Sequence, residues 1–112
     1  MKQQEIKQLI EGLNFSEVER LKAEGYLNEC FFNASGTLTE AYTWEAKEKK
    51  KYIYLDVGGS GAFMIEIETG LIFGIKGYGS PNKLKCYGSV FDMLDLFKFG
   101  KFLHSKRFDY RR

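Results

Sequence analysis

Residues that bind metals or form disulfides are scarce in this sequence. Its 112 residues include two cysteines, one histidine and one proline. Cys30 and Cys86 lie far apart, and neither belongs to a Cys-x-x-Cys pair, so the spacing of a zinc site is missing. We therefore expect no metal or other cofactor. Reduced thiols in a cytoplasmic setting are expected, although the sequence leaves open whether the two cysteines pair.

Long apolar runs are missing as well. No window approaches the length of a transmembrane helix, and the N-terminus lacks the apolar segment of a signal peptide. The sequence therefore predicts a cytoplasmic protein without a membrane partner. The length, with 44% hydrophobic and 29% charged residues, predicts a single domain over residues 1–112 with one core. Residues 104–112 are basic, and the prediction leaves room for a flexible tail there.

Aromatic residues are abundant and the charges are segregated. Ten Phe, seven Tyr and one Trp make up 16% of the chain, more than one small core needs, so some are expected at the surface. Residues 1–46 hold four Lys or Arg against eight Glu, a net charge of −4. Residues 71–112 hold nine Lys or Arg against three Asp, a net charge of +6. This asymmetry indicates either an anionic partner at the basic end or a solvated surface.

Residues 51–88 show the pattern of a β-meander, in which three apolar runs alternate with turn residues. A three-residue turn over residues 68–70 would place Ile65 opposite Phe73, and the glycine-rich turn before it would place Leu55 opposite Ile65. Because successive side chains of a strand point to opposite faces, these pairings place the apolar residues on one face of the sheet. That face is expected to hold Ile53, Leu55, Val57, Phe63, Ile65, Ile67, Leu71, Phe73 and Ile75.

Breaking and capping residues predict two helices before the meander. The first covers residues 2–11 and is broken by Gly12. The second begins at Ser16, which forms a capping box with Glu19, and it turns Glu17 toward solvent.

Weaker patterns predict the remaining elements. Residues 37–44 and 83–87 have the composition of short strands, and residues 90–99 that of a helix ended by Gly100. The predicted fold class is α+β: an antiparallel β-meander of three to five strands, with two N-terminal helices and one later helix packed on one face.

Residues 59–89 carry a resemblance to a group of phage proteins. GSGAFM is followed by ETGLIFGIKGYGSP and then by KCYGS. This order resembles a GSGxFM…TGxIYGIKxYGxP…YGT pattern shared by small accessory proteins of tailed bacteriophages and related mobile elements, although Phe73 stands at an expected Tyr and Ser89 at a common Thr. The resemblance implies a non-enzymatic protein that binds and inhibits a complex of the bacterial host cell, such as a CRISPR nuclease or another defence system.

The strongest candidate for a binding site combines basic and aromatic residues. Its partner is expected to be a host protein or ribonucleoprotein complex. The alternative function is that of a nucleic-acid-binding module, because lysines interleaved with aromatic rings suit single-stranded nucleic acid. The oligomeric state cannot be derived from the sequence. The expected partner-binding residues are Lys76, Tyr78, Lys83, Lys85, Tyr87, Arg107 and Arg111.

A small enzyme is the second alternative. Asp56 and Glu66 would lie on one face of the meander, about two strand positions apart, where paired carboxylates could perform acid–base chemistry. Surface carboxylates balanced by lysines explain the same residues more simply. The lone His104 lies in a basic segment and is expected in solvent. No catalytic residue is assigned on this basis.

Overall fold

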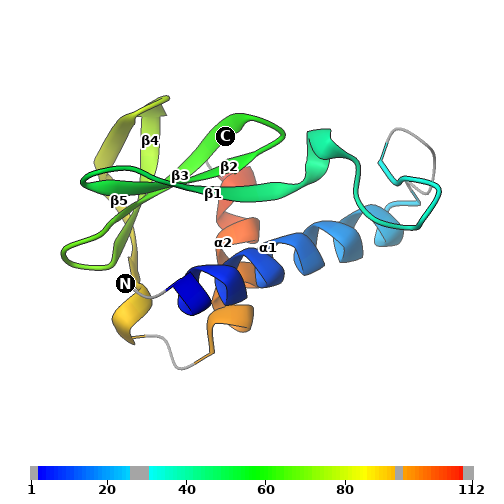
Figure 1. Ribbon diagram of the computed structural model, residues 1–112, viewed down its shortest axis with the longest axis horizontal. Coiled ribbons are helices and arrows are strands. Elements are labelled where there is room, and N and C mark those ends of the chain that lie inside the picture. Colours follow the sequence, from blue (N-terminus) through cyan, green and yellow to red (C-terminus); the bar gives the residue numbers. More distant parts are fainter. Residues whose placement is uncertain (1–2, 26–30, 93–94, 110–112) are drawn as a thin grey trace.

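The computed structural model describes residues 3–25, 31–92 and 95–109. It contains two α-helices, two short 3₁₀ helices and one five-stranded antiparallel sheet in the order β1-β2-β3-β4-β5 (Figure 1). The α+β meander is therefore confirmed, with two α-helices in these residues in place of the three expected. The elements are α1 (Gln3–Ala23), η1 (Glu40–Tyr42), β1 (Trp44–Glu48), β2 (Tyr52–Val57), β3 (Ser60–Glu66), β4 (Leu71–Gly77), β5 (Ser80–Ser89), η2 (Val90–Asp92) and α2 (Leu96–Asp109).

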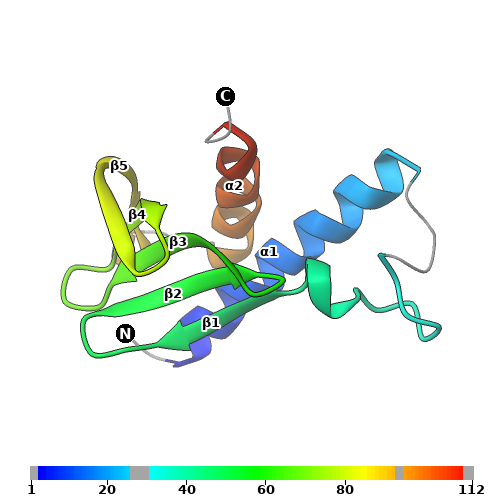
Figure 2. The ribbon, with the colours of Figure 1, turned by 90° about the horizontal axis from the view of Figure 1, so that it is seen from above.

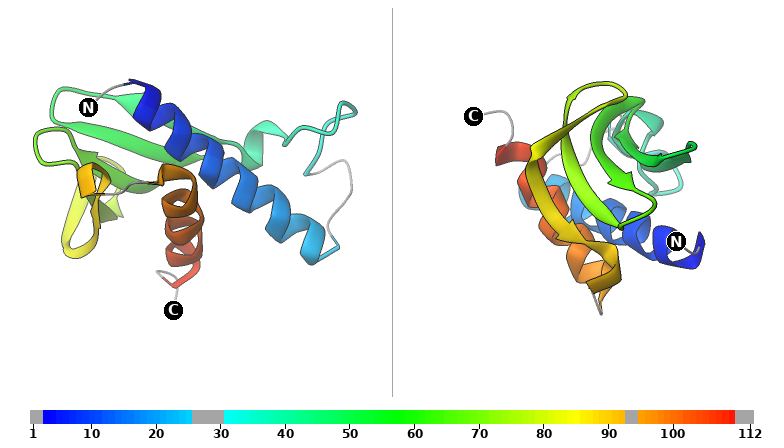
Figure 3. Two further views of the ribbon diagram at one scale, coloured as in Figure 1. Left: turned by 90° about the horizontal axis from the view of Figure 1, so that it is seen from below. Right: turned by 90° about the vertical axis from the view of Figure 1, so that its left-hand side faces the viewer.

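Both α-helices lie on the same side of the sheet, and the sheet curls so that the β4–β5 hairpin turns away from the β1–β2 hairpin (Figures 2 and 3). The main core fills the layer between helices and sheet. It joins Leu9 and Leu13 of α1, Leu103 of α2, and Leu55 and Ile65 of the sheet, all fully buried. The α1 surface that contacts the sheet thus comes from residues spaced four apart, as a helix facing a core requires.

α1 runs without a break through Gly12, so the prediction of two N-terminal helices was wrong. Gly12 lies where α1 crosses α2, and a Cβ atom there would lie 2.5 Å from the backbone oxygen of Phe97. Gly100 lies opposite within α2, where a Cβ would lie 2.8 Å from the backbone carbon of Gly12. The sequence pattern predicted that both glycines end a helix, but both lie inside one. The lack of a side chain lets the two helix backbones touch, and this packing overrides the low helix propensity of glycine.

The predicted register between β3 and β4 was wrong by one residue. The connecting turn spans residues 67–70, in which the Gly70 N–H donates to the Glu66 carbonyl at 2.7 Å. Because this turn is one residue longer than predicted, Ile65 pairs with Ile72. A one-residue slip exchanges the two faces of a strand. Ile72 therefore enters the main core, and Phe73 is buried on the opposite face.

The β2–β3 pairing also differs from the prediction, but without exchanging faces. Gly58 and Gly59, both with positive φ, form a two-residue turn of the kind that twisted hairpins favour. This turn pairs Asp56 with Gly61. A bulge between Asp56 and Leu55 then shifts the register by one residue, so that Leu55 pairs with Phe63, two positions from the expected Ile65.

The remaining elements differ from the sequence pattern mainly in length. Of residues 37–44, only Trp44 belongs to a strand, and β5 is ten residues long where a short strand over 83–87 was expected. The predicted helix 90–99 is a 3₁₀ turn followed by α2. Residues 104–109 of the predicted tail continue α2, and residues 110–112 lie outside the described residues.

Candidate binding surfaces

The face of the sheet that points away from the helices gathers tyrosines and lysines. The rings of Tyr54 on β2 and Tyr78 at the β4–β5 turn meet edge to face, with centroids 5.3 Å apart. Lys49 Nζ lies 5.9 Å from the Tyr54 ring centroid, and Lys83 Nζ lies 6.0 Å from that of Phe73. These distances are within reach of cation–π attraction. We call this region the tyrosine–lysine face; it consists of Lys47, Lys49, Tyr54, Tyr78 and Lys83.

A buried carboxylate anchors this face. Asp56 is 1% exposed; its Oδ2 atom accepts a hydrogen bond from the Tyr78 hydroxyl at 2.9 Å and lies 3.6 Å from Lys47 Nζ. The hydrogen bond to Asp56 raises the pKa of Tyr78 above its usual value, because the phenol loses a favourable contact when it ionises. The contact ties the β4–β5 turn to β2, while the Tyr78 side chain stays 57% exposed.

The structure does not bring Asp56 and Glu66 together. Glu66 pairs with Tyr52 across the sheet, whereas Asp56 lies four residues further along β2, about 13 Å away. Glu66 instead accepts a hydrogen bond from Thr69 at 2.7 Å and lies 3.7 Å from Lys83. The carboxylate pair of the enzyme hypothesis is therefore absent from the geometry. Within the described residues no three His, Cys, Asp or Glu side chains form a metal-binding group.

The predicted partner-binding residues fall on different surfaces. Tyr78 and Lys83 share the tyrosine–lysine face, and Lys76 is exposed at the end of β4. Lys85 and Tyr87 instead lie against Gly74, where a Cβ would be 3.4 Å from Lys85 Cβ and 3.6 Å from the Tyr87 hydroxyl.

Tyr87 is half-buried and packs against the margin of the main core. Its ring packs edge to face on Phe63, with centroids 5.5 Å apart, because β5 presents it toward the helices. Arg107 belongs to the last turns of α2, remote in sequence from the hairpin, and Arg111 lies outside the described residues. Of the two cysteines, Cys86 is an exposed free thiol, and Cys30 lies outside the described residues.

A second surface appears where the two helices meet solvent. Phe15 of α1 and Phe97 of α2 are 42% and 37% exposed, and their ring centroids are 4.9 Å apart. Lys101 Nζ lies 4.8 Å from the Phe15 centroid and 5.6 Å from that of Phe97, and 3.5 Å from the Glu19 carboxylate. We call these four residues the phenylalanine surface. Among the sequence features, only the excess of aromatic residues indicated that some of them would lie on the surface.

A buried ion pair also joins the two helices. Glu17 and His104 are 0% and 5% exposed, and the Glu17 carboxylate accepts a hydrogen bond from His104 Nε2. Arg20 also contacts Glu17, at 3.3 Å. Burial alone would raise the pKa of Glu17, but the hydrogen bond and charge of His104, with Arg20, hold it below its usual value. The predictions that Glu17 and His104 face solvent were both wrong.

Comparison with models of known protein families, with curated proteins and with solved structures found no match. Neither described helix is both long enough and apolar enough to cross a lipid bilayer.

Proposed function

We propose that this protein is a non-enzymatic binding protein that docks a protein partner through the phenylalanine surface. The observation that supports this most directly is the exposure of Phe15 and Phe97 side by side on two different helices. Large apolar side chains that gather on a surface mark interaction sites, whereas single exposed ones are common and carry no such meaning.

The geometry of this surface suits an interface centre. Phe15 and Phe97 are held by the crossing of α1 and α2, whose backbones touch at Gly12 and Gly100. Rings fixed in this way lose little conformational entropy when a partner covers them. Lys101 lies over both rings and offers a charge to an acidic group of the partner. Phenylalanine is among the aromatic residues that are enriched in the buried centre of protein–protein interfaces.

The partner that we propose is a protein or ribonucleoprotein complex of a bacterial host, which this chain would inhibit by occupying its surface. The support is the resemblance of residues 59–89 to phage accessory proteins, together with the absence of an assembled carboxylate pair. The phage and anti-defence assignment stays a prediction.

Affinity capture from bacterial lysate tests the proposal. Tagged full-length protein is expected to retain a defined complex, and Phe15→Ser with Phe97→Ser is expected to release it. Each such ring contributes about 2 kcal/mol, or roughly thirtyfold in affinity. Leu84→Ser is the matched control, because Leu84 is an apolar residue that is 93% exposed on β5 and belongs to neither helix. Nuclease assays on the captured complex then test inhibition. Equal capture by the double variant and the control would refute the assignment of this surface.

Nucleic-acid binding is the second candidate function, favoured by the placement of Lys49 and Lys83 beside aromatic rings while Tyr78 stays exposed. Bases stack on exposed rings such as that of Tyr78, and lysines neutralise the phosphates. Single-stranded oligonucleotides titrated across a salt series provide the test. The logarithm of the binding constant is expected to fall by about 0.7 per phosphate contacted for each unit of log salt. Tyr78→Ala should weaken binding, and lack of binding at low salt would exclude this function.

A further inference from the structure

The outer edge of β1 has backbone groups that remain unpaired. Lys49 N–H donates to the Tyr52 carbonyl and Gly58 N–H to that of Thr43, so the odd-numbered residues of β1 hydrogen-bond toward β2. The even-numbered residues, Trp44, Ala46 and Glu48, consequently direct their N–H and carbonyl groups outward. Figure 2 shows β1 as the outermost strand beyond β2. An edge of this kind is a template for another strand.

The side chain of Asn14 occupies one end of this edge. Its Oδ1 accepts a hydrogen bond from Trp44 N–H at 2.7 Å, and its Nδ2 donates to the Trp44 carbonyl at 3.4 Å. The amide thus reproduces the donor and acceptor of a neighbouring peptide group. Within the described residues, the outward backbone groups of Ala46 and Glu48 have no such partner. The part of the edge that remains open is therefore the segment from Ala46 to Glu48, next to the end that Asn14 occupies.

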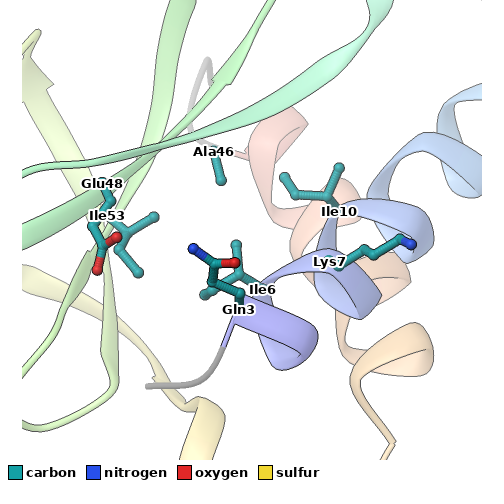
Figure 4. A pocket seen from close by; sticks show the side chains of 7 residues that line it. All are labelled: Gln3, Ile6, Lys7, Ile10, Ala46, Glu48 and Ile53. Atoms are coloured by element: carbon teal, nitrogen blue, oxygen red, sulfur yellow. The ribbon is translucent and has the colours of Figure 1, made fainter.

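An apolar groove lies beside this open segment. It has a volume of about 310 Å³ and separates the first half of α1 from β1 and β2. Figure 4 shows Ile6 and Ile10 of α1 on one side and Ala46 and Ile53 of the sheet on the other. The lining residues are Gln3, Ile6, Lys7, Ile10, Ala46, Glu48 and Ile53.

We propose that this edge and groove bind an extended segment of a partner protein as a sixth strand. Pairing with Ala46 and Glu48 would supply the backbone hydrogen bonds, and every second side chain of the added strand would point to the helix side of the sheet. An apolar side chain at that position enters the groove between Ile6, Ile10 and Ile53. The occupant is therefore an extended peptide that alternates apolar and polar residues. This inference is independent of the phenylalanine surface.

A second copy of this chain fits the site less well. If Ala46 of one copy paired with Glu48 of the other, Lys47 would lie opposite Lys47, and like charges directly opposite each other are unfavourable. If the pairing were centred on Ala46, Glu48 would face Trp44, whose outward groups Asn14 already holds. In the first register only Ala46 and Glu48 of the second copy would approach the groove, and neither supplies a large apolar side chain. In the second register Trp44 would lie on the same side, but it is 1% exposed because it belongs to the core of its own copy.

Titration of the full-length protein with short peptides tests the proposal. The probes are acetylated and amidated peptides in which leucine or phenylalanine alternates with threonine, with lysines at both ends for solubility. Two comparison series replace the apolar residue by serine or methylate the backbone nitrogens. Amide resonances of Ala46 and Glu48 are expected to shift, and their hydrogen exchange to slow, with the apolar series only. Serine or N-methyl peptides should bind about tenfold more weakly or worse.

Two variants separate the contributions of backbone and groove. Ala46→Pro removes one outward N–H at an edge position, where proline is tolerated, and Ala46→Phe fills the groove from within. Either one, if folded by circular dichroism, should weaken binding about tenfold or more. Ala34→Pro, in an exposed turn, is the control.

The proposal is overturned if no probe binds, if N-methyl peptides bind equally, if both variants bind normally, or if the edge is protected by self-association alone. Phe15→Ser should leave peptide binding unchanged, which separates this site from the phenylalanine surface.

Discussion

The crossing of α1 and α2 at two glycines makes Gly12→Ala the sharpest test of the fold. An alanine Cβ at this position would lie 2.5 Å from the Phe97 carbonyl oxygen, and 3.0 and 3.1 Å from two further backbone atoms of that residue. Backbone atoms inside a helix cannot rotate aside as a side chain does. The two helices would therefore have to separate. This separation would weaken the helix–helix contact, on which both the buried ion pair and the phenylalanine surface depend.

Two opposing terms determine the free-energy change. In an exposed helix interior, Gly→Ala stabilises by about 1 kcal/mol, since alanine loses less conformational entropy on folding. Inserting a methyl group into a packed contact costs about 1–3 kcal/mol. The overlap here is severe and involves only backbone, so the upper part of that range applies. The net expectation for Gly12→Ala is a loss of about 1–2 kcal/mol in the free energy of unfolding.

Urea denaturation, followed by circular dichroism, measures this difference. Gln8 is exposed on the same helix, and the difference between Gln8→Ala and Gln8→Gly calibrates the propensity term for this chain. Gly100→Ala should be similarly destabilising, because its Cβ would lie 2.8 Å from backbone atoms of Gly12 and Leu13. The double variant should cost less than the sum, since one separation of the helices relieves both overlaps.

A gain in stability for Gly12→Ala equal to the calibrated propensity difference would refute the reasoning. It would mean that the position is open and that the helices do not touch there. A loss as large as predicted, with additive effects of the two glycine variants, would show that each overlap is relieved separately and would contradict the single shared crossing.

Four further outcomes are expected. The lowered pKa of Glu17 means that its ion pair stabilises the fold above pH 4.5, its usual value, and that this contribution is lost as the pH falls through the folded-state pKa; denaturation across pH should show that loss, and Glu17→Gln should reduce it. His104→Leu removes one partner of the buried carboxylate and should cost about 3 kcal/mol, and a cost near zero would contradict the buried pair. Asn14→Ala takes away the bonds to both Trp44 backbone groups and should cost about 1–3 kcal/mol in urea denaturation. In ultraviolet titration Tyr78 should ionise above the usual tyrosine value, and Asp56→Asn should lower its pKa; unchanged titration would contradict the hydrogen bond.

The buried pair Glu17–His104 shows why part of the site escaped prediction. Both residues are polar and 87 positions apart in the chain, so local pattern assigns each to solvent. They are buried only because α1 and α2 meet, and that meeting depends on two glycines that local rules interpret as helix ends. The phenylalanine surface has the same origin: Phe15 and Phe97 become neighbours through the crossing, and no local pattern links them.

Local sequence determined the meander, because the alternation of apolar residues and the glycine-rich breaks are properties of a few adjacent residues. It did not determine the length of the β3–β4 turn, which has one residue more than predicted. It also determined one of the faces correctly, since Ile53, Leu55, Phe63 and Ile65 all enter the main core. Only the tertiary structure showed which face of β4 points to the core. Because the turn before it has one more residue than predicted, Ile72 enters the main core and Phe73 lies on the opposite face. The tertiary structure likewise decided the continuity of α1 and the binding surfaces, because each depends on contacts between segments that are distant in the chain.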